Sequence, residues 1–283
     1  MRTAMVISPH ADDAAAFCGG TLAKFAAEGW KVVLVRVTDD ARDSVGLTMD
    51  ETKRRNAAEM REGAGKLGVS EIVELGFPTD SLADVLLGQV RERIVYQIRK
   101  HQPYAVFTFD PDQRGEDNMD HVRVAQATAE AFWVSAFDLH YPEHFSEGLK
   151  SFSVCERWYF GRELAKPNFV EDVTDFLPQK IEALLCHQTQ LKHMLHQMIL
   201  QAHTWGRRVK GFEDAMDGDK RTLVSLFLTE QAKGVGEAWK LGEGRMGEVF
   251  RLVRFGDLEP LFQLFSEPLS DAEPSVKRKG LDG

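Results

Sequence analysis

The sequence has few cysteines and no surplus of positive charge, and each absence excludes a class of protein. Its 3 cysteines, Cys18, Cys155 and Cys186, are odd in number and widely spaced, which argues against a disulfide framework and against a Cys-x-x-Cys zinc site. The 44 Asp and Glu residues outnumber the 35 Lys and Arg residues, and the net charge of −9 repels phosphate backbones and anionic membrane surfaces. We therefore expect no nucleic-acid partner.

Long apolar runs and domain linkers are also absent. The longest apolar runs are shorter than the roughly 18 residues that span a bilayer, and Asp12 interrupts the N-terminus before a signal-peptide core could form. These features predict a cytoplasmic protein without membrane insertion. No internal repeat and no stretch rich in Pro, Gly or Ser divides the chain. Residues 270–283 lack apolar periodicity and are expected to form a disordered tail.

The ordered part of the sequence has the rhythm of an α/β protein. Short β-rich runs alternate with longer helical patterns over residues 3–135, as a mostly parallel sheet with crossover helices requires. We predict a Rossmann-like sheet flanked by helices over residues 1–200, and a C-terminal α+β extension packed on the same domain over residues 201–269. The expected strands are 3–8, 31–38, 71–75 and 105–109, and the expected helices are 20–28, 51–67, 81–100, one from near His121, and 175–199.

Two polar loops carry the residue types of a metal site. The motif His-Ala-Asp-Asp at residues 10–13 directly follows an apolar run, and the loop 110–120 leads from a buried strand to His121. Loops that follow parallel strands meet at one edge of the sheet, so we expect His10, Asp13 and His121 to converge there. Two imidazoles and one carboxylate suit Zn²⁺, which in catalytic sites keeps a fourth position open for water.

A zinc hydrolase also needs a group that accepts a proton. Bound zinc lowers the pKa of its water to about 7, so hydroxide becomes available near neutral pH. Asp12 is the candidate general base, because it lies beside the ligand Asp13 without being a ligand itself. Two simpler readings remain: the Asp pair caps a helix, or Gly19 and Gly20 cradle a phosphate in a nucleotide-binding module. The glycine spacing and the preceding acidic pair argue against the phosphate.

The motifs continue along the chain in a fixed order. Their combination resembles the LmbE-like, or PIG-L, family of zinc-dependent de-N-acetylases, over roughly residues 3–200. The matching segments are His10-Ala11-Asp12-Asp13, Gly19-Gly20-Thr21-Leu22-Ala23-Lys24, Leu67-Gly68-Val69, Leu75-Gly76-Phe77-Pro78, Asp120-His121, Lys180-Ile181-Glu182-Ala183-Leu184 and His187-Gln188-Thr189-Gln190, with a weaker echo at Gly247-Glu248-Val249-Phe250-Arg251.

The resemblance implies a chemistry for these residues. His10, Asp13 and His121 would bind zinc, and Asp12 would be the base. The implied substrate is an N-acetylglucosamine-type sugar or sugar conjugate, from which hydrolysis releases acetate and a free amine. Asp120 is expected beside a ligand imidazole, where a carboxylate fixes the orientation and tautomer of the ring.

One departure from the family concerns proton transfer. Family members usually carry His-x-Asp-His in the second motif, where the first His stabilises the tetrahedral intermediate or protonates the amine. Here that position is Asn118, whose amide donates hydrogen bonds but does not titrate. Either Asp12 performs both proton transfers, another group such as His140, His144 or His187 compensates, or activity is weak.

A second departure concerns the substrate contacts. Many relatives hold sugar hydroxyls with an Arg three residues before a Glu, and with an Asp after the Gly-Phe-Pro-like segment. Here Asn56 lies three residues before Glu59, Arg55 is one place off, and Thr79 is inserted before Asp80. Arg55 and Asp80 are the candidate substrate-binding residues.

Asn118 also motivates an alternative function, that of a non-catalytic or regulatory protein that has kept the metal site and lost turnover. The expected partner is a small amino-sugar molecule, and a homo-oligomer is compatible with the sequence. Neither the sugar nor its aglycone follows from the sequence, and another divalent metal stays open.

Overall fold

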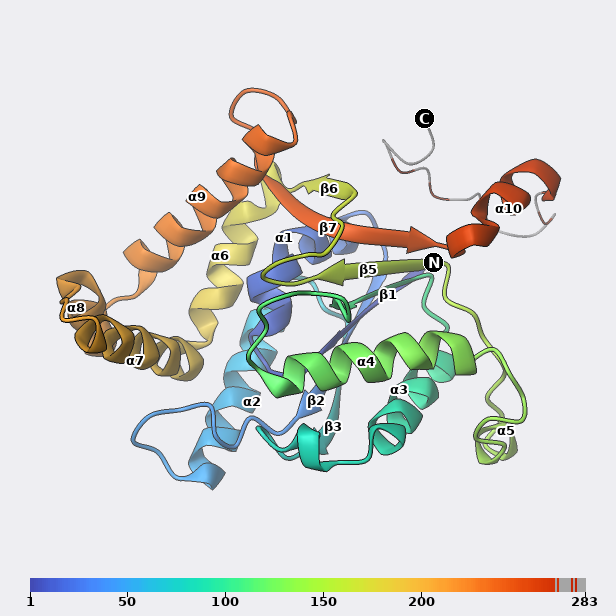
Figure 1. Ribbon diagram of the computed structural model, residues 1–283, viewed down its shortest axis with the longest axis horizontal. Coiled ribbons are helices and arrows are strands. Elements are labelled where there is room, and N and C mark those ends of the chain that lie inside the picture. Colours follow the sequence, from blue (N-terminus) through green and yellow to red (C-terminus); the bar gives the residue numbers. More distant parts are fainter. Residues whose placement is uncertain (268, 270–275, 277, 279–283) are drawn as a thin grey trace.

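The computed structural model describes residues 1–267, 269, 276 and 278. Most of the tail expected at 270–283 therefore lies outside the described residues. At the centre is a seven-stranded sheet with the order β3-β2-β1-β4-β5-β7-β6 (Figure 1). Its strands are β1 (Thr3–Ser8), β2 (Lys31–Thr38), β3 (Glu71–Phe77), β4 (Ala105–Phe109), β5 (Glu156–Phe160), β6 (Phe169–Asp172) and β7 (Gly247–Arg254).

The sheet is mostly parallel. Strands β1 to β5 pair in parallel, and β7 runs antiparallel to both β5 and β6. The strands β1, β2 and β4 are almost fully buried, as expected for central strands covered by helices on both faces. The predicted fold class is confirmed. Strand β7 also shows that the chain after residue 200 contributes to the central sheet.

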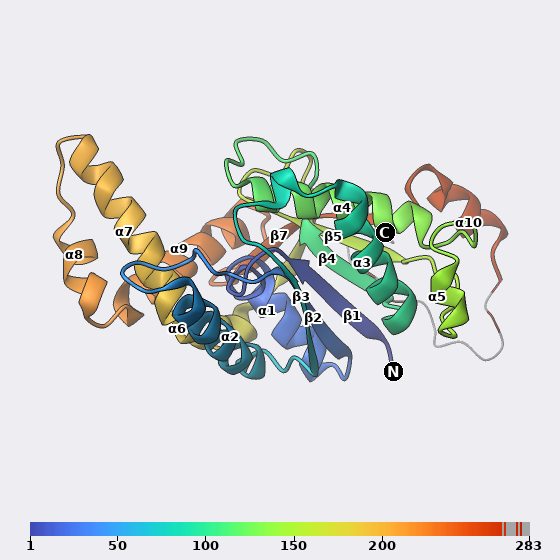
Figure 2. The same ribbon diagram turned by 90° about the horizontal axis from the view of Figure 1, so that it is seen from below.

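Helices cover both faces of the sheet. They are α1 (Asp13–Ala27), α2 (Met49–Lys66), α3 (Leu87–His101), α4 (Met119–Val134), α5 (Glu143–Ser146), α6 (Leu177–Cys186), α7 (Gln188–Thr204), α8 (Lys210–Asp217), α9 (Arg221–Ala238) and α10 (Glu259–Phe265), with 3₁₀ turns at Leu82–Asp84, Thr174–Phe176 and Gly256–Leu258. Apolar residues of α1, α2, α6 and α9 pack on one face, and those of α3 and α4 pack on the other. In Figure 2, α7 and α8 extend away from the sheet.

Three predicted helices differ from the observed ones. The first begins at Asp13 rather than at residue 20, although its backbone leaves the helical region at Cys18 (φ −136°, ψ 18°). The predicted helix 81–100 is a 3₁₀ turn followed by α3, which begins at Leu87. The predicted helix 175–199 is two helices, because His187 has a non-helical backbone (ψ 55°). Apolar periodicity does not reveal single residues that leave the helical conformation.

The fold brings three connections together at one edge of the sheet. Strands β1, β2 and β4 are parallel neighbours, and their C-terminal ends lead into the loops 9–12, 39–48 and 110–118. In the part of the chain that the structure describes, no helix combines the length and apolar character needed to cross a bilayer.

Candidate metal centre

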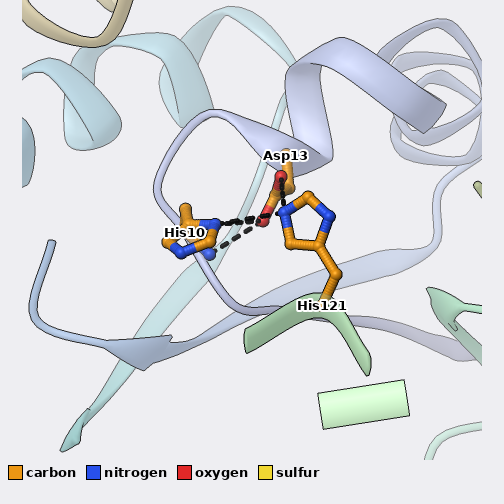
Figure 3. Close-up of side chains that lie close together, drawn as sticks. All are labelled: His10, Asp13 and His121. Carbon is orange, nitrogen blue, oxygen red and sulfur yellow. Dashed lines mark hydrogen bonds and ion pairs between the residues drawn. The ribbon is translucent and has the colours of Figure 1, made fainter. Parts of the chain in front are cut away.

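His10, Asp13 and His121 form one compact group of potential metal ligands (Figure 3). The His10 Nδ1 and His121 Nε2 atoms lie 3.2 Å apart. The Asp13 carboxylate faces both rings, with 3.4 Å from Oδ2 to His10 Nδ1 and 3.4 Å from Oδ1 to His121 Nε2. All three residues are buried, with exposed fractions of 5%, 4% and 3% respectively. The structure thus brings together the three residues that the sequence analysis expected to converge.

The spacing of these atoms fits a tetrahedral metal ion. Zinc bonds to nitrogen and oxygen ligands of about 2.0–2.1 Å, with tetrahedral angles, place neighbouring ligand atoms about 3.3 Å apart. The two imidazole nitrogens are 3.2 Å apart, which agrees with that value, and each lies 3.4 Å from a different oxygen of the Asp13 carboxylate. Two imidazoles and one carboxylate also leave one coordination position open, as catalytic zinc sites require. The residues present therefore fit the metal that the sequence motif predicts.

The loop that carries His10 is held by bonds within itself. The backbone amide of His10 donates to Asp13 Oδ2 over 2.8 Å, so the same carboxylate that faces the rings also fixes the turn. The Ser8 hydroxyl donates to the carbonyl of His10 over 3.1 Å. Asp13 is the first residue of α1, where a carboxylate interacts favourably with the helix dipole.

The neighbouring strand end holds the same loop from outside. The Thr38 hydroxyl donates to the carbonyl of Pro9 over 2.8 Å, and the amide of Ala11 donates to Asp40 Oδ2 over 3.2 Å. Asp40 is fully buried, has a left-handed backbone (φ 51°), and pairs with Arg36 Nη1 at 2.9 Å. Sequence analysis missed Asp40; the only signal was an acidic residue just after a strand that ends at this edge.

Each imidazole has a carboxylate near its other nitrogen. His10 Nε2 lies 3.4 Å from Asp120 Oδ2, and His121 Nδ1 lies 3.0 Å from Glu116 Oε2. Such pairs set the tautomer and orientation of ligand histidines. Asp120 is where the resemblance places it, and the amides of Asp80 and Leu82 fix it by donating to its carboxylate over 2.7 and 3.2 Å. Sequence analysis missed Glu116, which is one of several acidic residues in its loop.

Aromatic side chains form the apolar wall of the site. The His121 ring stacks on Phe109, with ring centres 4.0 Å apart. Phe17 of α1 packs edge-on against Phe109 at 4.9 Å, and its ring centre is 6.5 Å from that of His121. This wall restricts the orientation of the His121 ring.

Further carboxylates surround His10. Asp12 is half-buried beside Asp13, and burial together with the charge of Asp13 raises the pKa of Asp12 to about 7. Asp43, in the loop between β2 and α2, was not predicted from the sequence. Burial raises its pKa to about 8, and the charges of Asp40, Asp12 and Asp80 act in the same direction. Several carboxylates therefore lie close together near His10.

The second-motif residue Asn118 caps a helix. Its side-chain oxygen accepts a hydrogen bond from the amide of Asp120 over 2.9 Å, which makes Asn118 the N-cap of α4. Among the histidines considered as substitutes, His144 is bound to Glu92 and Arg99, His187 is buried at the α6–α7 junction, and His140 is exposed. None of the three belongs to the metal-ligand group.

The two candidate substrate-binding residues lie in different surroundings. Asp80 is exposed with a left-handed backbone (φ 55°), and its charge reaches Asp43 near the site. Arg55 lies on the exposed side of α2 and pairs with Glu51 over 2.6 Å. Asn56, which occupies the family's Arg position, is fully buried and donates to the carbonyls of Asp40 and Asp43, so it supports the loop 39–48.

Comparison with known proteins gives a family match over the N-terminal part of the chain. Residues 5–132 match the family model described as PIG-L, GlcNAc-PI de-N-acetylase, and this stretch contains the whole metal-ligand group. The resemblance drawn from the sequence motifs is thereby confirmed.

Two curated proteins that resemble this chain are deacetylases by name. It is 28% identical over 192 residues to the diacetylchitobiose deacetylase of Thermococcus kodakarensis, covering 67% of this chain and 70% of the relative. It is 26% identical over 243 residues to 1D-myo-inositol 2-acetamido-2-deoxy-alpha-D-glucopyranoside deacetylase 1 of Saccharopolyspora erythraea, covering 68% and 79% of the two chains.

A solved structure supports the fold of this chain. The N,N'-diacetylchitobiose deacetylase of Pyrococcus horikoshii superposes with a TM-score of 0.71 at 23% identity, over 92% of this chain and 88% of that one. These comparisons give no support to the alternative reading of a non-catalytic family member.

Proposed function

We propose that this protein is a zinc-dependent hydrolase that removes the acetyl group from an N-acetylglucosamine-type sugar or sugar conjugate. The observation that carries the proposal is the buried His10–Asp13–His121 group, whose imidazole nitrogens lie 3.2 Å apart and 3.4 Å from the two oxygens of Asp13, with the non-ligand Asp12 beside it. The named activities of the curated relatives supply the substrate class.

The proposed division of labour follows from these positions. A zinc ion bound by His10, Asp13 and His121 would supply a water that ionises near neutral pH and a positive charge that polarises the acetamide carbonyl. The carboxylate of Asp12 takes the proton of the attacking water and returns it to the leaving nitrogen as the C–N bond breaks. The products are acetate and the free amine of the sugar.

Asn118 has a restricted role in this scheme. Its side-chain oxygen is engaged in capping α4, so the amide nitrogen is the part that remains to donate to a developing oxyanion. Asp12 then performs both proton transfers. Asp120 and Glu116 hold the two imidazoles in the orientation that directs His10 Nδ1 and His121 Nε2 toward each other.

The carboxylates around the metal-ligand group indicate which kind of substrate could bind there. We infer a small amino-sugar substrate whose hydroxyls bind to carboxylates near His10, including that of Asp80. We also propose that the protein is cytoplasmic, as its sequence predicts.

The test is zinc-dependent amine release by the purified protein. The panel contains N-acetylglucosamine, N,N'-diacetylchitobiose and inositol-linked N-acetylglucosamine, each assayed after chelation and after zinc is restored. Chelation should abolish turnover and zinc should recover it. His121→Ala should lose both metal and turnover, whereas His140→Ala, which alters an exposed histidine outside the site, should keep both.

One outcome would reject the proposal: turnover that survives both chelation and His121→Ala would show that the metal group is not the catalytic centre. Silence across the panel, with one zinc bound per chain, would favour either a substrate outside the panel or the non-catalytic alternative, and Asn118→His would then be the next test.

A further inference from the structure

Three sequence motifs that the metal centre does not use meet at one buried ion pair. Gly19-Gly20-Thr21 comes from α1, Lys180 from α6 and Glu248 from β7. Lys180 Nζ donates to Glu248 Oε1 over 2.6 Å, and the two side chains are only 5% and 4% exposed. A buried pair of this kind needs further hydrogen bonds to offset its lost hydration.

Backbone amides that follow a break in α1 supply those further hydrogen bonds. The backbone at Cys18 leaves the helical region, so the part of α1 that follows has amides without partners in the preceding turn. The amides of Gly20 and Thr21 donate to Glu248 Oε1 and Oε2 over 3.0 and 2.8 Å, and the Thr21 hydroxyl donates to Oε2 over 2.6 Å. Glu248 thus caps the rear part of α1 as an N-terminal carboxylate would, although it comes from a distant strand.

Because Gly19 and Gly20 have no side chains, Lys180 and Glu248 can lie close to the backbone of α1. A Cβ atom on Gly20 would lie 2.8 Å from Val173 Cβ and 3.2 Å from Glu248 Oε1. A Cβ atom on Gly19 would lie 3.2 Å from Lys180 Cγ. The Gly-Gly-Thr motif is therefore the surface against which the Lys180–Glu248 pair packs.

The front part of α1, residues 13–17, carries a metal-ligand residue. Asp13 faces both imidazoles, and Phe17 contacts the Phe109 ring on which His121 stacks. The direction of this short segment relative to the rest of α1 depends on the break at Cys18. A change in the break would move the Asp13 carboxylate relative to His10 and His121.

We propose that Glu248 is a positioning residue for the metal centre: by capping α1 behind its break, it fixes the segment that presents Asp13. Glu248 contacts none of the three residues of the metal-ligand group in the structure described, so it acts through the helix. The proposal rests on the proposed metal-binding role of His10, Asp13 and His121.

The test compares Glu248→Gln with a matched variant on the same helix. Lys24, in the rear part of α1, pairs with Glu171 of β6 over 2.5 Å, away from the break. Both Glu248→Gln and Glu171→Gln remove a carboxylate that binds α1, and both should lower thermal stability. Zinc affinity is measured by competition with a chromogenic chelator, so the readout does not depend on turnover.

We expect Glu248→Gln to bind zinc at least tenfold more weakly than the unmodified protein, within the range found when groups supporting metal ligands are removed. Glu171→Gln should stay within twofold. If Glu248→Gln does not fold, the neutral pair Glu248→Gln/Lys180→Met replaces it, with the same expected loss. Zinc affinity in the folded variant equal to that of Glu171→Gln would overturn the inference. Amine release by the unmodified protein decides the proposed function separately.

Discussion

Arg278 provides a quantitative test of a buried ion pair at the start of β5, because its partner Glu156 is the first residue of that strand. Its guanidinium donates from Nε and Nη2 to Glu156 over 3.1 and 2.9 Å. It also lies over the rings of Phe25 and Trp158, at 4.9 and 4.8 Å from their centres. Glu156 is completely buried and Arg278 is 7% exposed, so water solvates neither charge well.

Arg278→Ala should therefore be strongly destabilising. The substitution leaves the Glu156 carboxylate buried with Trp158 Nε1 as a remaining donor at 3.0 Å. Removing one partner of a buried ion pair costs about 3–5 kcal/mol. Larger domains lose about 2–4 °C in Tm per kcal/mol, so the expected fall in Tm is roughly 6–20 °C. The double variant Arg278→Met/Glu156→Gln should recover much of this loss, because no unpaired charge remains.

Urea and thermal unfolding of these variants give the measurement. Arg207→Ala is the matched control, because Arg207 also lies over a ring, that of Trp205 at 5.4 Å, but is exposed. The control should change the unfolding free energy by less than about 1 kcal/mol. An Arg278→Ala protein as stable as Arg207→Ala would refute the account of this ion pair.

Further predictions concern positions nearer the site. Burial lowers the pKa of His187 to about 4 from the usual 6.5, so the stability from the neutral ring is complete above pH 6.5 and is lost as pH falls toward 4. Urea unfolding of the metal-free protein should show a loss of roughly 3 kcal/mol over that range that is absent in His187→Gln; equal slopes would contradict this. Gly63→Ala places a Cβ atom 2.8 Å from His187 Nε2 and should cost about 1–3 kcal/mol, whereas Gly65→Ala meets open space and should cost nothing. Asn118→Ala should lose about 1 kcal/mol of stability by removing the cap of α4, whereas Asn118→Ser should keep the cap but lower kcat, because it removes the amide nitrogen proposed to donate to the oxyanion; unchanged kcat in the Ser variant would contradict that role.

The metal-ligand group was predictable because its members occupy positions that the chain order determines. His10 and Asp13 follow a strand whose apolar run is visible in the sequence, and His121 opens the helix after another such strand. Parallel strands place these connections at the same edge. The motif spacing then carried the family assignment, which the comparisons confirm.

The groups that support the ligands were less accessible to sequence analysis. Asp40, Asp43 and Glu116 are single acidic residues in loops rich in acidic residues, and only the folded arrangement shows which of them face His10 or His121. The break at Cys18 escaped detection for a related reason. The amide of Gly20, just after the break, donates to Glu248, which lies 228 residues away, and no local pattern encodes that contact.

We propose that one metal ion held by His10, Asp13 and His121 drives deacetylation. The experiment that tests this role measures the rate of acetate release from N,N'-diacetylchitobiose as zinc is titrated into metal-free protein, with zinc binding followed in the same samples. The rate should rise in proportion to bound zinc up to one equivalent per chain, and His121→Ala should show neither binding nor acetate release. Acetate release that is independent of bound zinc, or unchanged in His121→Ala, would contradict it.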